Sequence, residues 1–424
     1  MRAKSPRTFW SIEVKVYMDI IVQKYGGTSL ADTQRIRAVA ERIAETRKKG
    51  YKVLVVVSAQ AGMTDMLVKK IREVCPAPHK READVVLSTG ELISIGLLSI
   101  AINSLGIPAM SMNSFQAGIS TEGDYMRSKI STIKMDVIMS SFKFYDVIIL
   151  PGFQGVNKNN EITTLGRGGS DITAVALAAA LKINEVEIYT DVDGVYTADP
   201  RIVKNAQKID RLTYQEMLEM SGSGAKVLHS RSVELAAKND LVIKLLSSFN
   251  YVKGTDIRKE EDCMEKPSVR AISHNMNEAK ITITGVGGDA SNIAHIFREI
   301  SKESINVDII VQDMENCKSN ISFIVSREDY SVAMETVKKI CLSLGADEIK
   351  GDSHVAKVSV VGIGMKSNPG VAAAVFDVLS NEKISIYMIS CSEIKISCII
   401  HEKDTEHAVR SLHRHFFETG AKGA

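Results

Sequence analysis

The sequence has few of the features on which nucleic-acid-binding and membrane proteins depend. Only 5% of its residues are aromatic, which leaves little surface on which nucleobases stack. Its 53 basic and 51 acidic residues give a net charge of +2, so no broad basic field exists to hold a nucleic acid or an anionic membrane. Small metabolites are therefore the expected partners, with neither nucleic acid nor a membrane among them.

Long hydrophobic runs and paired cysteines are also scarce. No apolar run reaches the roughly 18 residues of a transmembrane helix, and the six cysteines are widely spaced without a CxxC pair, unlike a disulfide framework or a zinc site. A reducing cytoplasm is the simplest location. Residues 1–17 lack the hydrophobic segment and cleavage site of a secretion signal. We expect an N-terminal extension here, disordered or derived from upstream sequence, with a peripheral first strand as the alternative.

Apolar strands alternate with helical patterns through the first part of the 424-residue chain. Residues 20–24 and 53–58 read as strands on either side of an amphipathic helix over 32–49. The alternation continues with helices over 90–105 and 171–181 and strands over 146–150 and 185–190. Such βαβ units predict a three-layer α/β/α sandwich with a mostly parallel sheet, whose ligands bind at the carboxyl ends of the strands. We assign this catalytic domain to residues 18–250.

The pattern changes after residue 250. Residues 251–268 are charged without apolar periodicity, which is typical of a linker. Beyond them Gly285-Val286-Gly287 recurs as Gly362-Ile363-Gly364, and each copy reads as strand, helix, two strands and a second helix. Two α+β modules with ferredoxin-like sheets are therefore predicted, over 269–350 and 351–424.

Three glycine-rich turns follow predicted strands and carry most of the chemical signal. In Lys24-Tyr25-Gly26-Gly27-Thr28-Ser29 the glycines let the backbone approach a phosphate, and the lysine adds a positive charge. The turn over 164–171 opens an apolar helix whose free N–H groups suit an anion, while Arg167 is able to grip a carboxylate with two hydrogen bonds. The third turn, over 190–201, has room for a ribose and an adenine.

In this order the three turns resemble those of aspartate kinases, members of the amino acid kinase superfamily. Further matching segments are 58–65, 88–91, 116–119 and 224–229. The resemblance covers nearly the whole chain after Met18 and implies an amino acid kinase domain followed by two ACT domains. It implies transfer of the γ-phosphate of ATP to the β-carboxylate of L-aspartate, giving 4-phospho-L-aspartate and ADP. That reaction opens lysine, threonine, methionine and diaminopimelate biosynthesis. Because little sequence follows the second ACT copy, we expect a monofunctional enzyme without a fused homoserine dehydrogenase.

The resemblance also implies roles for individual residues. The catalytic residues are Lys24, Asp171 and Lys226. The ATP-binding residues are Lys24, Tyr25, Gly26, Gly27, Thr190, Asp191, Tyr196, Arg201, Lys226 and Val227. The substrate-binding residues are Ser58, Thr64, Glu91, Arg167, Gly168, Gly169 and Ser170, with Arg167 at a carboxylate and Glu91 at the ammonium. Mg²⁺ is expected to bridge the ATP phosphates without a dedicated protein ligand, so no metal site is assigned.

In this family ACT domains bind end-product amino acids, so lysine or threonine is the expected feedback effector. The matching positions are Asn306, Gln312, Val371, Ala372, Ser385, Ile386 and Ser392. Two departures weaken the match: Gly288 stands where an acidic contact is common, and Ser385 replaces a common asparagine. The ACT sheets are also expected to join the protein into a homodimer or a higher homo-oligomer. For these effector positions the alternative is that they serve the dimer interface alone.

Other interpretations of the same residues remain open. Arg167 and Asp171 also fit a helix cap with an incidental ion pair, and Glu91 also fits the complement of a helix N-terminus. A glutamate or N-acetylglutamate kinase shares the predicted fold, and a catalytically inactive amino acid sensor is the alternative from another class. The intact Lys24, Arg167 and Asp171 disfavour the sensor.

Overall fold

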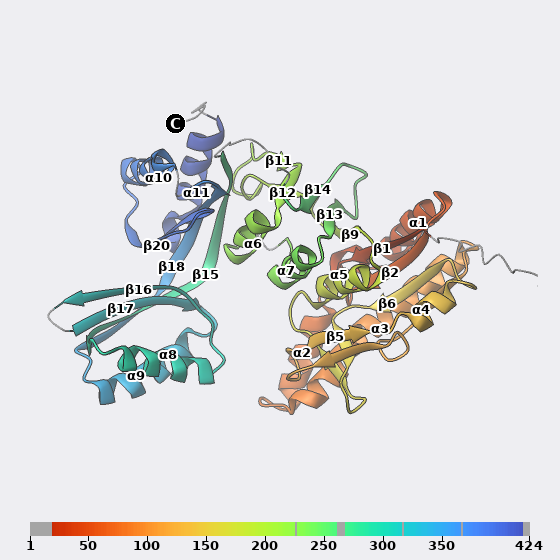
Figure 1. Cartoon of the computed structure of the whole chain (residues 1–424), viewed down its shortest axis with the longest axis horizontal. Helices are drawn as coiled ribbons and strands as arrows, with labels where there is room; N and C mark the ends of the chain where they lie inside the picture. The colour runs from red at the N-terminus through yellow and green to blue at the C-terminus, as the bar shows by residue number, and fades with distance from the viewer. Residues whose placement is uncertain (1–18, 225–226, 261–267, 316–317, 366–367, 419–424) are drawn as a thin grey trace, which may run out of the picture. The chain divides into compact units, whose positions relative to one another are not determined.

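The computed structural model describes residues 19–224, 227–260, 268–315, 318–365 and 368–418 (Figure 1). The predicted N-terminal extension and Lys226 lie outside these residues. The chain divides into two compact units, Met1–Glu187 and Ile188–Ala424, and each is described on its own.

The first unit is built on four parallel strands in the order β1-β2-β6-β3. They are β1 (Ile20–Tyr25), β2 (Lys52–Val57), β6 (Val147–Pro151) and β3 (Ala109–Ser111). Residues 53–57 of β2 are all fully buried, as expected for a β-branched strand covered on both faces. Burial of each valine or leucine side chain contributes roughly 1.5–3 kcal/mol to the free energy of folding, so this strand stabilises the unit strongly. The predicted parallel sheet is confirmed.

Helices and a small second sheet surround these strands. The helices are η1 (Gly27–Leu30), α1 (Thr33–Lys48), α2 (Met63–Val74), α3 (Lys80–Ser104), α4 (Asp136–Ser141) and α5 (Gly169–Leu181). The small sheet, in the order β5-β4-β7-β8, contains β5 (Lys129–Ile133), β4 (Ile119–Glu122), β7 (Gln154–Val156) and β8 (Ile162–Thr164). The sequence did not predict this sheet, because its strands are only three to five residues long.

Helix α3 begins ten residues before the predicted start at Gly90. Glycine weakens a helix interior, but at Gly90 a Cβ atom would lie 2.8 Å from the Ala59 Cβ atom, so close packing explains the residue. Among the described residues α3 is the one helix long and apolar enough to cross a membrane, and half of its most apolar window is buried in the fold. It also buries Asp84 and Glu91, which is typical of a core helix.

Strand β9 (Glu185–Thr190) starts in the first unit, where Glu187 accepts a hydrogen bond of 2.8 Å from Gln23 of β1, and continues into the second. There the order is β9-β13-β14-β12, with β13 (Val242–Ser247), β14 (Thr255–Arg258) and β12 (Arg211–Thr213). The predicted linker therefore contains a strand, β14. This part also holds β10 (Val195–Tyr196), β11 (Lys208–Ile209), α6 (Tyr214–Gly222) and α7 (Ser230–Lys238).

The rest of the second unit contains one six-stranded antiparallel sheet, in the order β16-β17-β15-β18-β20-β19. Its strands are β15 (Ser268–Gly287), β16 (Val307–Glu315), β17 (Lys318–Ser326), β18 (Glu348–Ile363), β19 (Ile386–Cys391) and β20 (Lys395–His401). The helices are α8 (Ala290–Lys302), α9 (Tyr330–Leu344), α10 (Pro369–Asn381) and α11 (Thr405–His413). The short η2 (Glu402–Asp404) precedes α11, and the short η3 (Arg414–Glu418) follows it.

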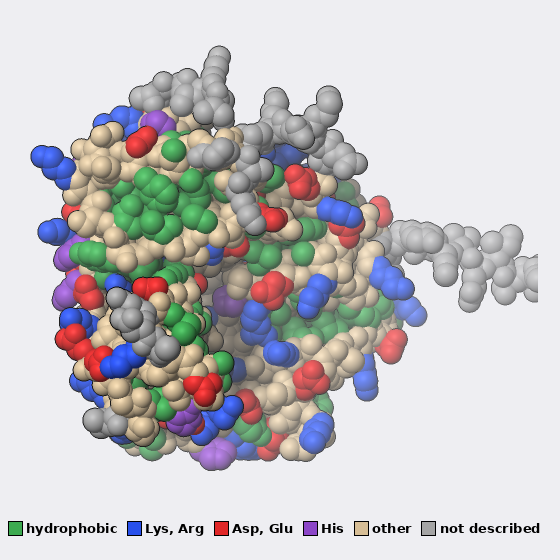
Figure 2. Space-filling model, turned by 60° about the vertical axis from the view of Figure 1, so that its left-hand side comes forward, with side chains coloured by type: hydrophobic (Ala, Val, Ile, Leu, Met, Phe, Trp, Pro, Cys, Tyr) green, Lys and Arg blue, Asp and Glu red, His purple; other side chains and the backbone are tan. Residues whose placement is uncertain are grey.

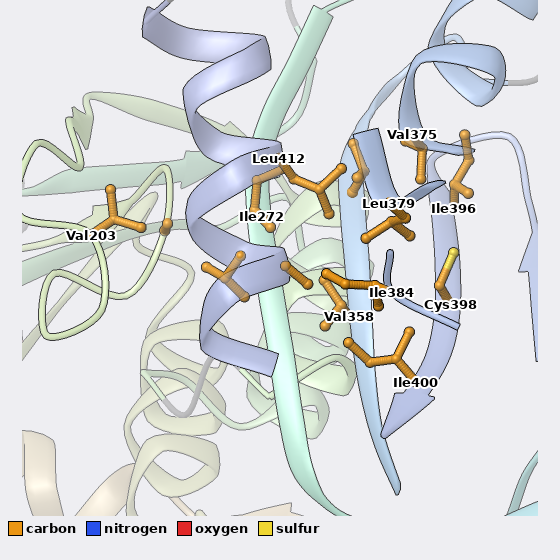
Figure 3. Packing of buried hydrophobic residues seen from close by; sticks show 14 of the residues in the cluster. Val203, Ile272, Val358, Val375, Leu379, Ile384, Ile396, Cys398, Ile400 and Leu412 are labelled. Carbon is orange, nitrogen blue, oxygen red and sulfur yellow. The ribbon is translucent and has the colours of Figure 1, made fainter. Parts of the chain in front are cut away.

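Each predicted module has its own hydrophobic core. Helices α8 and α9 enclose one core, which includes Ile296, Phe323 and Val337. Helices α10 and α11 enclose the other, in which Leu379 and Leu412 lie against strand residues such as Val358 (Figure 3). The two α+β modules predicted from the internal repeat are thus present.

The two modules share their longest strands, which the repeat did not reveal. Residues 268–275 of β15 pair with 357–363 of β18, whereas 280–284 of β15 pair with 348–352. The start of the segment predicted as the first module therefore completes the sheet of the second. The boundary between 350 and 351 stays a prediction. On the face seen in Figure 2 acidic and basic side chains are interspersed, without a broad basic area.

Candidate active site

A buried ion pair lies where the first two glycine turns meet. Lys24, the penultimate residue of β1, and Asp171, in the first turn of α5, are each 8% exposed. The Lys24 Nζ atom lies 2.6 Å from the Asp171 Oδ1 atom, with the alignment of an ion pair rather than of a straight hydrogen bond. The structure therefore brings together the two catalytic residues predicted in this unit.

Close backbone packing fixes the first glycine turn. At Gly27 a Cβ atom would lie 2.5 Å from the Ala59 carbonyl oxygen, so only glycine fits. The Ser58 N–H donates to the Tyr25 carbonyl at 3.1 Å, and the Ala61 N–H donates to the Gly27 carbonyl at 3.1 Å. These bonds join the turn to the loop that carries Ser58.

Glu91 reaches the same loop from the middle of α3 and is 3% exposed. Its Oε1 atom accepts a hydrogen bond of 3.0 Å from the Ala59 N–H, while its Oε2 atom is buried without a partner among the described residues. Burial raises the pKa of Glu91 from 4.5 to about 7, against the opposing effect of the Ala59 hydrogen bond. A buried carboxylate with an unused oxygen is suited to an ammonium group that arrives with a ligand.

The second turn presents Arg167 between two glycines in left-handed conformations, with φ of 79° at Gly166 and 72° at Gly168. Arg167 is exposed and has no ion-pair partner in the part of the chain that the structure describes. Ser170 lies behind it at 7% exposure, so close to Gly152 that a Cβ atom there would be 2.5 Å from the Ser170 Cβ atom. The arrangement leaves a free guanidinium beside the rigid N-terminus of α5.

The remaining predicted substrate residues of the first unit are less confined. Ser58 follows β2 directly, and Thr64 lies in the first turn of α2, both half-buried. Gly168 is the N-cap of α5 and Gly169 its first residue. All of them lie on the loops that follow strands or begin helices, as predicted for a site at the carboxyl ends of parallel strands.

The third turn belongs to the second unit, where Asp193 and Asp199 have hydrogen-bond partners within the turn itself. The Tyr196 hydroxyl donates to the Asp193 Oδ1 atom at 2.8 Å, and both burial and this bond raise the pKa of Tyr196. The Arg201 guanidinium donates to both carboxylate oxygens of Asp199, at 3.0 Å from Nε to Oδ1 and 2.7 Å from Nη2 to Oδ2, and lowers the pKa of that carboxyl.

The structure also describes two other residues of this unit that are predicted to bind ATP. Thr190 ends β9, and its hydroxyl donates to the exposed Asp191 at 3.0 Å. Val227 is half-buried. Lys226 lies outside the described residues, so its proposed role is untested.

The predicted effector residues fall into both modules of the six-stranded sheet. Asn306 and Gln312 are exposed at β16, where the Gln312 side-chain amide donates to the Ser319 hydroxyl at 2.9 Å. In the other module Val371 and Ala372 begin α10, Ser385 and Ile386 lead into β19, and Ser392 forms the β19–β20 turn.

Asp84 is a positioning residue that the sequence analysis missed. It is fully buried in α3 and accepts hydrogen bonds from the Thr164 N–H at 3.0 Å, the Thr164 hydroxyl at 2.6 Å and the Met126 N–H at 2.9 Å. It thereby fixes the strand end that leads into the Gly166–Gly168 turn. Its spacing offered a signal, because Asp84 and Glu91 lie seven residues apart on one face of an otherwise apolar helix.

Metal ligands are not gathered at this site. Among residues 19–418, leaving out the undescribed gaps, no group of three or more His, Cys, Asp or Glu side chains is placed to hold a metal ion. At the candidate site the Asp171 carboxylate is already paired with the Lys24 ammonium.

Comparison with known proteins identifies the family. A model of the amino acid kinase family matches residues 19–247, and an ACT domain model matches 358–416. The chain is 46% identical over 402 residues to an aspartokinase of Pseudomonas aeruginosa, covering 94% of this chain and 98% of that protein. It is 43% identical over 399 residues to aspartokinase 2 of Bacillus subtilis, with 94% and 98% covered.

Solved structures agree with this assignment. The fold matches E. coli aspartokinase III in complex with lysine and aspartate, at a TM-score of 0.71 and 26% identity, over 94% of this chain and 100% of that one. The same enzyme in complex with aspartate and ADP matches with a TM-score of 0.78 at 24% identity, over 94% and 100%. The chain therefore belongs to the aspartokinase family of ATP-dependent kinases, with an amino acid kinase domain and ACT domains.

Proposed function

We propose that the protein transfers the γ-phosphate of ATP to the β-carboxylate of L-aspartate, giving 4-phospho-L-aspartate and ADP. A carboxylate oxygen bonds to the γ-phosphorus while the bond from that phosphorus to the β–γ bridging oxygen breaks, and its electron pair leaves with ADP. The observation that carries this proposal is the buried Lys24–Asp171 pair beside the N-terminus of α5.

The chemical problem is the approach of two anions. A transition state of this kind spreads charge over the phosphoryl oxygens, so catalysis consists of positioning and charge neutralisation. Lys24 supplies a cation with little access to water, where its attraction for a phosphate is stronger than at the surface. Asp171 holds that ammonium in place, and the N-terminus of α5 adds the positive end of a helix dipole.

Aspartate itself requires one cation for a carboxylate and one anion for its ammonium. Arg167 is exposed and unpaired among the described residues, and its fork matches a carboxylate. Glu91 has an oxygen free for the ammonium. Ser58 and Thr64 supply hydroxyls, and Gly168 and Ser170 supply backbone N–H groups. Gly169, whose own N–H donates to the Gly166 carbonyl at 3.1 Å, shapes the turn that presents them.

The nucleotide is assigned to the backbone of Lys24–Gly27, to Thr190, Asp191, Tyr196 and Arg201, and to Lys226 and Val227. Mg²⁺ would neutralise part of the charge on the ATP phosphates. Since the described residues gather no carboxylate cluster, its ligands would come from the phosphates and water.

Regulation by lysine, threonine or both is proposed for the ACT domains, through the seven effector positions named above. It is supported by the solved complex of E. coli aspartokinase III with lysine. We also propose a cytoplasmic homo-oligomer that opens lysine, threonine, methionine and diaminopimelate biosynthesis. Activity measured with lysine and threonine, separately and together, tests the effector.

One experiment separates this function from its rivals. Purified protein with Mg²⁺ and ATP is assayed for ADP release with aspartate, glutamate and N-acetylglutamate, and hydroxylamine trapping measures the acyl phosphate. We expect release with aspartate alone. Release with another acid would assign a different acceptor, and no release with any acid would favour an amino acid sensor.

A further inference from the structure

Three cations from three neighbouring strands join helix α6 to the six-stranded sheet for which regulation is proposed, called the regulatory sheet below. The acceptors on α6 recur every three residues and thus lie along one face of the helix. The donors lie on β15, β18 and β20, which are adjacent in the sheet. The pairs are Arg270 Nε to Glu216 Oε1 at 3.2 Å, Lys357 Nζ to the Gly222 carbonyl at 3.3 Å and Lys395 Nζ to Glu219 Oε2 at 2.7 Å.

Lys357, the middle cation, is the buried member of this set. Its side chain is 2% exposed, compared with 45% for Arg270 and 20% for Lys395. Its ammonium lies 3.0 Å from Glu278 of β15 and 2.5 Å from Asp308 of β16. With the Gly222 carbonyl, these partners use all three ammonium donors.

The Gly222 carbonyl is at the negative end of α6, where a cation is favourable. The chain that follows is pressed against β15: Ser223 is fully buried, and at Gly224 a Cβ atom would lie 1.9 Å from the His274 carbonyl oxygen. Its φ of 106° also restricts that position to glycine. Val227, a proposed ATP contact, comes three residues after Gly224 in the sequence.

The opposite end of this network lies in the first regulatory module. Asp308 is located at a register shift of β16, and the next residue, Ile309, has a φ of 34°, which is strained for a β-branched side chain. The Ile309 N–H donates to the Asp308 Oδ1 atom at 2.9 Å and holds the bulge. The proposed effector residues Asn306 and Gln312 lie on either side of it in the sequence.

We propose that Lys357 is a positioning residue for the nucleotide: its ammonium fixes the carbonyl end of α6, and with it Ser223 and Gly224, to Asp308 and Glu278 of the regulatory sheet. The inference rests on the proposed kinase reaction for its kinetic consequence. A purely structural lysine would affect both substrates alike, whereas this role requires an effect on ATP alone.

The test compares variants in nucleotide affinity and in thermal stability. Lys357→Met removes the ammonium and keeps most of the side-chain volume, but it leaves Glu278 buried without its cation. The double variant Glu278→Gln with Lys357→Met removes both charges and guards against misfolding. Lys350→Met is the matched control, because Lys350 lies on the same strand with its side chain 70% exposed.

We expect the dissociation constant of Mg-ADP, measured by calorimetry, and the KM for ATP to rise about tenfold in both Lys357 variants. The KM for aspartate should stay within about twofold, and the double variant should melt close to the unaltered protein. Unchanged ADP affinity in a folded Lys357 variant, or an equal rise in both KM values, would overturn the inference. If the unaltered protein binds ADP but shows no aspartate-dependent turnover, the proposed reaction fails instead, and calorimetry still tests the positioning role.

Discussion

The proposed site residues of the first unit and those of the second unit differ in how their charges are placed. In the first unit Lys24, Asp171 and Glu91 are all less than 10% exposed, and one carboxylate oxygen of Glu91 has no partner among the described residues. In the second unit Arg201 is 89% exposed on its side chain, and it is already paired with Asp199. The first unit therefore contributes buried charges, one of which has an unused carboxylate oxygen, and the second unit contributes an exposed charge that already has a partner.

The difference in burial indicates which unit provides the residues that perform the chemistry. A charge with little access to water interacts strongly with a developing charge and needs no reorganisation when the reaction occurs. An exposed ion pair contributes little to binding, because solvent screens it and its partner must be displaced. The first unit is therefore expected to determine turnover and the second mainly nucleotide affinity.

Lys24→Ala should have the largest effect. Without the ammonium, two anions approach each other unassisted, and we expect kcat to fall about a hundredfold to a thousandfold. Steady-state assays of ADP release measure the loss. Because the substitution leaves Asp171 buried and unpaired, the double variant Lys24→Ala with Asp171→Asn controls for folding by thermal melting. Lys49→Ala, at an exposed position, is the matched control. Full turnover in a folded Lys24 variant would place the chemistry elsewhere.

Arg167→Ala sharpens the comparison, because Arg167 is an exposed charge in the first unit, where the other proposed site charges are buried. Loss of a charged pair of hydrogen bonds should raise the KM for aspartate about tenfold to a hundredfold and leave kcat within a few fold. The KM for ATP serves as the internal control. A loss confined to kcat would contradict a binding role and assign Arg167 to the phosphoryl group.

Glu91 should make the KM for aspartate depend on pH. If the carboxylate pairs with the substrate ammonium, aspartate binding requires ionised Glu91, whose pKa is raised to about 7 by burial. We expect the KM for aspartate to rise roughly tenfold for each pH unit below 7 and to be flat above pH 8. Glu91→Gln should show a high KM without this slope. A wild-type KM that is constant from pH 5.5 to about 8 would remove Glu91 from the ammonium site.

The raised pKa of Glu91 also makes the free energy of unfolding depend on pH, with greater stability at low pH. The folded protein holds the Glu91 proton more tightly than the unfolded chain, so this contribution to stability is complete below about pH 4.5 and is lost as the pH rises through about 7. A rise in pKa from 4.5 to about 7 corresponds to a free energy on the order of 3 kcal/mol. Urea unfolding of Glu91→Gln should lack this pH dependence.

Much of this site was predictable, because local rules determine it. Lys24 before two glycines and Asp171 in a glycine-opened helix are signatures within a few residues, and the structure brings them to 2.6 Å. Parallel strands such as β2 were evident as continuous apolar runs. The repeat likewise predicted two modules with separate cores.

The features that the sequence did not predict depend on contacts between distant segments. Nothing near residue 268 indicates that the first half of β15 would join the second module, because both halves have the same strand pattern. Strand β14 was hidden in a charged segment, since a four-residue strand takes its stability from pairing with β13 and β12. Lys357 reads as an ordinary strand lysine until Glu278, Asp308 and Gly222 surround it.

Arg201→Ala should have the smallest effect, and it tests the comparison from the exposed side. Arg201 must release Asp199 before it is able to contact a phosphate, so the new interaction replaces an existing one. We expect the KM for ATP to rise only about twofold to fivefold, with kcat and the KM for aspartate unchanged. Lys204→Ala, at a nearby exposed position, is the control. A rise above tenfold would mean that the Arg201–Asp199 pair opens readily, and exposure would then no longer distinguish residues that bind the nucleotide from residues that act in catalysis.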